Sequence, residues 1–210
     1  MESTQIEVIK QLLQINTLKI QPSNPFTWAS GWKSPIYCDN RKILSYPKTR
    51  AFICNKFVEV IKEKYPDAEV IAGVATGAIA HGVLVAEKLG LPFIYVRSKP
   101  KGHGLENLIE GDLKPGQKVV VIEDLISTGV SSLNAAEAIS NFGGQVSGMV
   151  AIFTYNFPLA KENFQKANVE LSTLSRYQVL IDTALEMNEI TKDQVNSLMK
   201  WREDPANWGK

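Results

Sequence analysis

The chain has 210 residues, of which 44% are hydrophobic and 21% are charged, a composition typical of a soluble globular protein that can bury its own core. Its 23 basic and 22 acidic residues leave a formal net charge of +1, so no overall basic field indicates nucleic acid as a partner. The N-terminus lacks a secretion-signal pattern and no apolar run approaches the roughly 18 residues of a membrane span, so we expect a cytoplasmic protein without a membrane partner.

Two helices and an irregular hairpin are expected in the first third of the chain. Apolar residues recur at roughly helical spacing in residues 5–19 and again in residues 47–64. Between them, the proline-rich stretch 21–42 predicts a hairpin with several turns. We interpret residues 1–45 as an N-terminal hood-like subdomain, a hairpin attached to a single domain that spans residues 1–210.

The remainder of the chain alternates between strands and helices. Helices are expected at residues 77–90 and 131–144, and each pattern ends at glycine, a common helix terminator. The expected strands are residues 69–75, 91–97, 117–124, 145–155 and 169–174. Strands that alternate with helices require right-handed crossovers, so we predict an α/β fold with a mostly parallel central sheet flanked by helices.

Glu123 and Asp124 stand side by side at the end of an apolar strand. Two adjacent carboxylates repel each other in a core, and ligands of parallel sheets bind beyond the carboxyl ends of the strands, so we expect the acids to face a site. The small residues from Ser127 to Ser132 then lead into a helix, whose first N–H groups bind anions. A solvated turn is the alternative for the serines alone, but the acid pair favours a sugar-phosphate site.

This stretch resembles the 5-phosphoribosyl 1-diphosphate (PRPP) signature of type I phosphoribosyltransferases: an apolar strand, two acids, two variable residues, Ser/Thr-Thr-Gly and a helix. The resemblance implies that Glu123 and Asp124 engage the ribose hydroxyls while Ser127 to Ser131 wrap the 5-phosphate. It also implies a catalytic role for Asp124, because a carboxylate near C1 stabilises an oxocarbenium-like transition state. The PRPP-binding positions implied here are Glu123, Asp124, Leu125, Ile126, Ser127, Thr128, Gly129, Val130 and Ser131.

A second loop, `ATG` at residues 75–77, follows the strand 69–75. It stands where the same family has its pyrophosphate loop, so the resemblance implies PRPP contacts from Thr76 and Gly77. Some members carry a lysine at the position of Gly77, and the contribution of this chain would then come from backbone. A plain strand-to-helix turn is the alternative for this loop by itself. His81, one turn into the next helix, is expected to be structural.

A third loop, residues 97–110, gathers Arg97, Lys99, Lys101 and His103 among proline and glycine. Clustered cations on a loop usually form a solvated surface, but a polyphosphate needs cations to offset its charge. The loop is similar to the catalytic hood of orotate phosphoribosyltransferases. The resemblance implies that these four side chains bind PRPP, that Lys101 and His103 are catalytic, and that the Arg97–Glu110 loop reaches the neighbouring active site of a homodimer.

The segment `FTWASGWKSPIYCDNR`, residues 26–41, bears on the acceptor. Its order of Phe-Thr, Ser-Gly, Ser-Pro and Tyr resembles the N-terminal hairpin of orotate phosphoribosyltransferases, which implies orotate contacts from Tyr37, Cys38 and Ser127. Tyr155 borders the same site and stands where some members have an arginine that grips orotate. Because tyrosine cannot replace that charge, our hypothesis is that Arg41 holds the orotate carboxylate.

Taken together, these resemblances imply transfer of ribose 5-phosphate from PRPP to N1 of orotate, giving orotidine 5′-monophosphate and diphosphate, in pyrimidine (UMP) biosynthesis. Mg²⁺ is the implied cofactor and would be held mainly through PRPP, with Asp124 as the candidate protein ligand. Two alternatives remain open at this point. One is a phosphoribosyltransferase for another base, and the other is a regulator of the same fold that binds PRPP without turnover.

Overall fold

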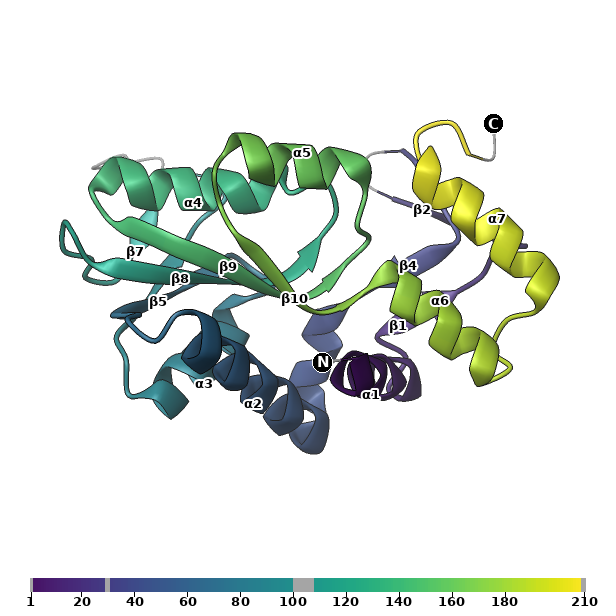
Figure 1. Ribbon diagram of the computed structural model, residues 1–210, viewed down its shortest axis with the longest axis horizontal. Helices are drawn as coiled ribbons and strands as arrows, with labels where there is room; N and C mark the ends of the chain where they lie inside the picture. The colour runs from purple at the N-terminus through teal and green to yellow at the C-terminus, as the bar shows by residue number, and fades with distance from the viewer. Residues whose placement is uncertain (1, 29–30, 100–107, 209–210) are drawn as a thin grey trace.

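The computed structural model describes residues 2–28, 31–99 and 108–208. A six-stranded sheet runs through the molecule with helices on both faces (Figure 1). From one edge to the other its strands are β10 (Leu171–Arg176), β9 (Gln145–Thr154), β8 (Lys118–Ile126), β5 (Val70–Val74), β6 (Phe93–Val96) and β7 (Ile109–Glu110). All neighbouring strands are parallel except β6 and β7. The predicted α/β fold with a mostly parallel sheet is therefore confirmed.

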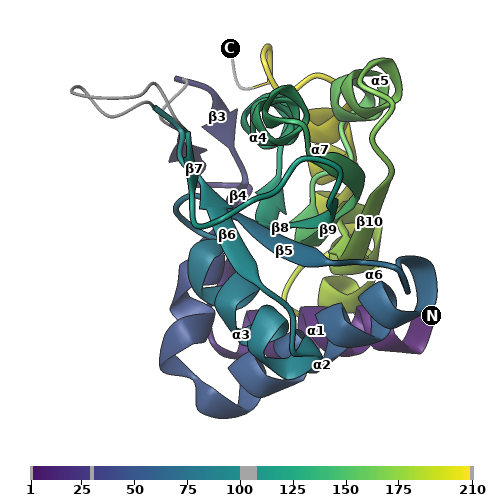
Figure 2. The same ribbon diagram turned by 90° about the vertical axis from the view of Figure 1, so that its left-hand side faces the viewer.

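Helices cover both faces of this sheet. They are α2 (Pro47–Lys64) and α3 (Ile79–Leu89) on one face and α4 (Val130–Phe142) and α5 (Pro158–Lys166) on the other. Figure 2 shows β6 and β7 at the front edge of the sheet, with α4 and α5 above it and α2 and α3 below it. This double cover explains why every residue of β5 is buried and why the strands read as continuous apolar runs. The predicted glycine stops are also present, since α3 ends at Gly90 and α4 at Gly143, both in the left-handed region.

The N-terminal hairpins lie at one end of the molecule, beside three helices (Figure 1). The elements of this end are α1 (Glu2–Gln14), β1 (Leu18–Ile20), β2 (Phe26–Thr27), β3 (Lys33–Ser34), β4 (Ile36–Cys38), the 3-10 helix η1 (Asn40–Ser45), α6 (Tyr177–Glu186) and α7 (Lys192–Glu203). The predicted helix over residues 5–19 is wrong at its end. The chain turns left-handed at Asn16, with φ of 55°, and Leu18 pairs with Cys38 in an antiparallel ladder although its apolar side chain continues the helical spacing.

The C-terminal helix α7 is fixed to the N-terminal hairpin by Trp201. This side chain has no exposed surface, and its indole N–H donates a hydrogen bond to the main-chain oxygen of Lys33 at 3.1 Å. The ring makes edge-on contacts with Trp28 and Tyr155, at centroid distances of 5.7 and 5.5 Å. Tyr177 of α6 also lies against it. Aromatic pairs of this kind add to the burial energy, so the two ends of the chain share one core.

β8 runs further than the sequence predicts. The expected strand ends at Asp124, but the observed pairing with β9 continues through Ile126, which lies opposite Thr154. The neighbour on the other side, β5, pairs with β8 only as far as Ile122. Strand length here is set by the ten-residue β9, which no local pattern in β8 reveals.

Within the described part of the chain, no helix has both the length and the apolar character that crossing a membrane requires.

Candidate active site

Glu123 and Asp124 lie where the winding of the sheet reverses. From β5 the chain passes through α3 to β6 on one side, and from β8 it passes through α4 to β9 on the other. Because Gly73 pairs with Ile122, Glu123 lies level with Val74, the last residue of β5, and Asp124 extends past the carboxyl end of that strand. Open α/β sheets bind ligands in the crevice at such a switch point.

Glu123 is held beneath the start of α4. Its side chain accepts a hydrogen bond from Ser132 Oγ at Oε2 (2.7 Å) and one from the main-chain N–H of Asp124 at Oε1 (2.8 Å). Only 5% of the residue is exposed, and burial, followed by the charge of Asp124, raises the pKa of its carboxyl well above the usual range. Its predicted contact with the ribose stays a prediction, and here the side chain anchors the acidic segment (residues 123–129).

Asp124 lies directly on the main chain of Gly77. A Cβ atom added to Gly77 would come within 2.4 Å of Asp124 Cγ and Oδ2, far inside van der Waals contact. The acidic segment therefore touches the Thr76 loop (residues 75–78), as a site that binds both ends of one ligand requires. This contact also explains why glycine stands where some family members have lysine. The peptide bond between Ala75 and Thr76 is cis.

The acidic segment turns into α4 at Gly129, which has a φ of 82° and has Phe164 packed against its Cα. Both the left-handed conformation and the close ring demand glycine. No side chain in the described part of the chain caps α4, so the N–H groups of its first turn remain for a ligand. Ile126 belongs to the core, so any ligand contact there would come from its main chain, whereas Val130 is exposed.

The cationic loop (residues 97–110) is closed at its base. Arg97 donates its main-chain N–H to the oxygen of Leu108 at 2.8 Å, and its Nη1 lies 3.3 Å from Oε1 of Glu110. Arg97 also lines a cavity of about 310 Å³, together with Ala75 and others, that opens between the strand ends and α4. The further lining residues relevant to the predictions are Ser98 and Ser131. Lys99 is exposed, while Lys101 and His103 lie outside the described residues.

The predicted base-binding residues Tyr37 and Cys38 lie in the Tyr37 segment (residues 36–41), close to Asp124. Burial, then the charge of Asp124, raises the pKa of the Cys38 thiol. Burial raises the pKa of the Tyr155 hydroxyl well above its usual value, and the next largest contribution in the same direction comes from Cys38. Tyr37 is 37% exposed and packs on the ring of Phe26 at 5.5 Å. Cys38 and Tyr155 therefore lie within electrostatic range of Asp124, although Tyr155 is only 1% exposed.

Arg41 lies at the exposed rim of the same segment. Its Nε donates to Asp39 Oδ1 at 2.7 Å, and 61% of its side chain is exposed. The hydrogen bond to Asp39, more than any other contact, raises the pKa of the guanidinium. Asp124 and Tyr37 act on it in the same direction, which places Arg41 within electrostatic range of both.

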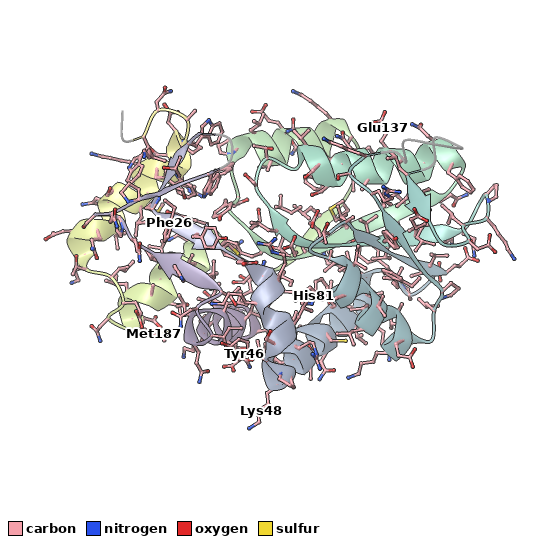
Figure 3. All side chains as sticks on the ribbon, turned by 180° about the vertical axis from the view of Figure 1, so that it is seen from behind. Phe26, Tyr46, Lys48, His81, Glu137 and Met187 are labelled. Atoms are coloured by element: carbon pink, nitrogen blue, oxygen red, sulfur yellow. The ribbon has the colours of Figure 1, made fainter. Side chains whose placement is uncertain are left out.

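Sequence reasoning missed two asparagines that contact the acidic segment, and the buried His81 lies beside one of them. Asn40 Nδ2 donates to the main-chain oxygen of Asp124 at 2.5 Å, and Asn163 Nδ2 donates to that of Thr128 at 3.0 Å. His81 is 2% exposed and lies inside the molecule (Figure 3). Burial lowers the pKa of His81, while the charge of Asp124 and a hydrogen bond to the backbone of Asn40 oppose that shift. Asparagine in a turn or on a surface helix is so common that neither position carries a signal in one sequence.

Comparison with known proteins agrees with this geometry. Residues 46–173 match the model of the phosphoribosyl transferase domain. The chain is 60% identical over 202 residues to an orotate phosphoribosyltransferase of Porphyromonas gingivalis, an alignment that covers 96% of each protein.

Solved structures with the same fold include two proteins from other organisms. The Leishmania donovani UMP synthase superposes with a TM-score of 0.77 and 26% identity, covering 93% of this chain and 42% of that one. The orotate phosphoribosyltransferase of Aeropyrum pernix superposes with a TM-score of 0.76 and 24% identity, covering 88% of this chain and 99% of that one. With the acid pair, the Thr76 loop and the Tyr37 segment at one switch point, the chain belongs to the orotate phosphoribosyltransferases, within the family of the phosphoribosyl transferase domain.

Proposed function

We propose that the protein transfers ribose 5-phosphate from PRPP to N1 of orotate, in the cytoplasm, as a step of pyrimidine nucleotide biosynthesis. The bond between C1 and the diphosphate oxygen breaks, a bond from C1 to N1 forms, and N1 gives up its proton. The products are orotidine 5′-monophosphate and diphosphate. The observation that carries the proposal is the contact of Asp124 with Gly77, because it joins the acids of the PRPP signature to a second anion-binding loop.

The two ends of PRPP would occupy different parts of the site. The first turn of α4 and the hydroxyls of the acidic segment would take the 5-phosphate, supported by the uncapped helix start and the conformation of Gly129. Thr76 and Gly77 would contribute main-chain contacts to the diphosphate. Asp124 would lie near the ribose and offset the positive charge that develops at C1. Positioning and charge, rather than a covalent nucleophile, would then drive the reaction.

The cationic loop would close over the diphosphate. Arg97 and Lys99 would stand at its base, and Lys101 and His103 would supply the catalytic cations. Such closure excludes water and strengthens each charged contact. We propose that the loop acts in the neighbouring active site of a homodimer, with residues 1–45 as the hood-like subdomain. The paired ends of the loop, held by Arg97 and Glu110, give it a fixed base, which supports this proposal.

The orotate ring would lie along the main chain of Tyr37 and Cys38, with Ser127 and Tyr155 at its border. The proximity of Cys38 and Tyr155 to Asp124 supports this position, because the base must approach C1 of the ribose. Arg41 would hold the orotate carboxylate. Its rim position and its partner Asp39 allow the guanidinium to offer its remaining N–H groups to a second carboxylate.

Mg²⁺ would be the cofactor. The described residues include no group of three His, Cys, Asp or Glu side chains that could hold a metal ion. The carboxylate oxygens of Asp124 fit the oxygen ligands that Mg²⁺ prefers, and the diphosphate and ribose hydroxyls of PRPP would provide the other ligands. Bound there, the ion would offset the negative charge of the leaving diphosphate.

A panel of bases tests the proposed function. Purified protein is mixed with PRPP, Mg²⁺ and orotate, and the loss of orotate absorbance is followed, with the product identified by chromatography. Parallel reactions contain adenine, hypoxanthine, xanthine or uracil. Turnover with orotate alone is expected. Turnover with another base would overturn the assignment of residues 26–41, and PRPP binding without any turnover would indicate a regulator.

A further inference from the structure

The main chain of the acidic segment is held at two points by side chains from distant parts of the sequence. Asn40, from the start of η1, donates to the oxygen of Asp124 at 2.5 Å. Asn163, from α5, donates to the oxygen of Thr128 at 3.0 Å. One contact lies at the carboxylate end of the segment and the other at its hydroxyl-rich end. The segment between them is therefore fixed from outside as well as by its own pairing with β9.

The contact made by Asn40 belongs to a buried polar cluster. Asn40 is 1% exposed, and its Oδ1 has no hydrogen-bond partner among the described residues. Nε2 of His81 is also buried and has no hydrogen-bond partner among the described residues. The imidazole ring does form a hydrogen bond to the backbone of Asn40. Buried polar atoms without partners cost free energy, so stability alone does not account for this cluster. A role in the geometry of the site does.

Asn40 also connects two parts of the site. It directly follows the residues Tyr37, Cys38 and Asp39, and its side chain reaches across to the acid pair. The base and the ribose must meet at one carbon atom, and reacting atoms need placement to within a fraction of an ångström. A hydrogen bond between the Tyr37 segment and Asp124 sets that relative placement.

We propose that Asn40 and Asn163 are positioning residues that preorganise the acidic segment from its two ends. Asn40 fixes Asp124 relative to the base, and Asn163 fixes Thr128 and the turn that precedes α4. Neither acts on substrate directly, because each donates its amide to a main-chain oxygen of the segment. The inference rests on the proposed function and extends it. It assigns the contact at Asp124 to the chemical step and the contact at Thr128 to the binding of PRPP.

The two roles predict changes in different kinetic constants, in kcat for Asn40 and in the KM of PRPP for Asn163. Loss of the Asn40 contact misplaces Asp124 where charge develops, so Asn40→Ala should lower kcat about tenfold and leave the KM of PRPP within about twofold. Loss of the Asn163 contact loosens a phosphate site that binds substrate and transition state alike. Asn163→Ala should therefore raise the KM of PRPP about tenfold at nearly constant kcat. Asn196→Ala, an exposed asparagine on α7, is the matched control.

An isosteric variant separates positioning from folding. Asn40→Asp keeps the shape of the side chain but presents an oxygen, in place of the amide donor, to the main-chain oxygen of Asp124. Its kcat should therefore fall at least as far as that of Asn40→Ala, with the KM of PRPP within about twofold of wild type. A side chain that only fills space would leave kcat at the wild-type value. Thermal melts of each variant show whether it is folded at the assay temperature.

The outcomes distinguish this inference from the proposed function. If wild type converts orotate and both alanine variants show the control's kcat and KM, the positioning roles are wrong. The same conclusion follows if the two variants change kcat and KM in the same proportion, or if folded Asn40→Asp keeps the wild-type kcat. If wild type itself shows no turnover, the proposed function fails instead. PRPP titrations of wild type and Asn163→Ala then still test the phosphate end, with equal Kd values overturning it.

Discussion

Replacing Gly77 by alanine tests the contact between the Thr76 loop and Asp124. The new Cβ would lie 2.4 Å from Asp124 Cγ and Oδ2 and 2.6 Å from Oδ1, whereas ordinary contact begins at 3.4 Å. The carboxylate must therefore move by about 1 Å. A displacement of that size at a reacting centre can cost about 10²-fold in rate, or about 2.7 kcal/mol of transition-state stabilisation. The obstacle is a short side chain at the site, so the melting temperature should fall by only a few degrees.

The assay measures kcat and KM for orotate and PRPP by loss of orotate absorbance, alongside thermal melting. Gly148→Ala is the matched control, because its Cβ would lie 2.4 Å from Tyr65 OH, on β9 opposite the first half of β8. We expect this control to lose stability while its kcat/KM stays within about twofold of wild type. If Gly77→Ala kept at least half of the wild-type kcat/KM, Asp124 would not stand at the reacting centre and the reasoning would be refuted.

Three further changes test other parts of the site. Arg41→Ala should raise the KM of orotate about tenfold, the lower end for a charge-assisted hydrogen bond, with the KM of PRPP unchanged; equal shifts in both constants would contradict its proposed role. Lys101→Ala should lower kcat by about 10²–10³, by analogy with the loss of one oxyanion donor, and a rate equal to that of the surface control Lys10→Ala would exclude a catalytic role. Glu123→Gln removes a buried acid whose pKa is raised in the folded protein. The folded state therefore holds this proton more tightly than the unfolded state, so the stability of wild type relative to the variant should be highest below about pH 4.3 and fall as the pH rises through the folded pKa. Urea unfolding at several pH values measures this difference, and a constant difference would rule out burial as the cause.

The fold was predictable because its signals are local. Apolar runs, glycine stops and the alternation of strands with helices identify an α/β sheet without any knowledge of tertiary contacts. The end of α1 was not predictable in the same way. Leu18 fits the helical spacing, and only its pairing with Cys38 across the hairpin makes it a strand residue. The length of β8 was not predictable for the same reason, because its last residues form a strand only where β9 pairs with them.

The candidate site also contains some residues that the sequence reveals and others that it does not. Glu123 and Asp124 are visible in the sequence because two acids after an apolar strand are unusual. Their different environments are not visible, since Ser132 covers one and Gly77 supports the other. Asn40 reaches Asp124 across 84 positions, and Asn163 reaches Thr128 across 35. Contacts at such separations leave no pattern in a single chain, so residues that act by holding others escape sequence reasoning.

The hydrogen bond from Trp201 to Lys33 has a consequence for synthesis of the protein. The hairpin β2–β3 is synthesised before every strand of the six-stranded sheet, but the indole that supports it belongs to α7, which follows the last of those strands in the sequence. A nascent chain can therefore complete the sheet and its acid pair while the hairpin still lacks its aromatic support. We expect the sugar-phosphate half of the site to mature before the base half, and the orotate pocket to gain its final shape only after α7 has been made.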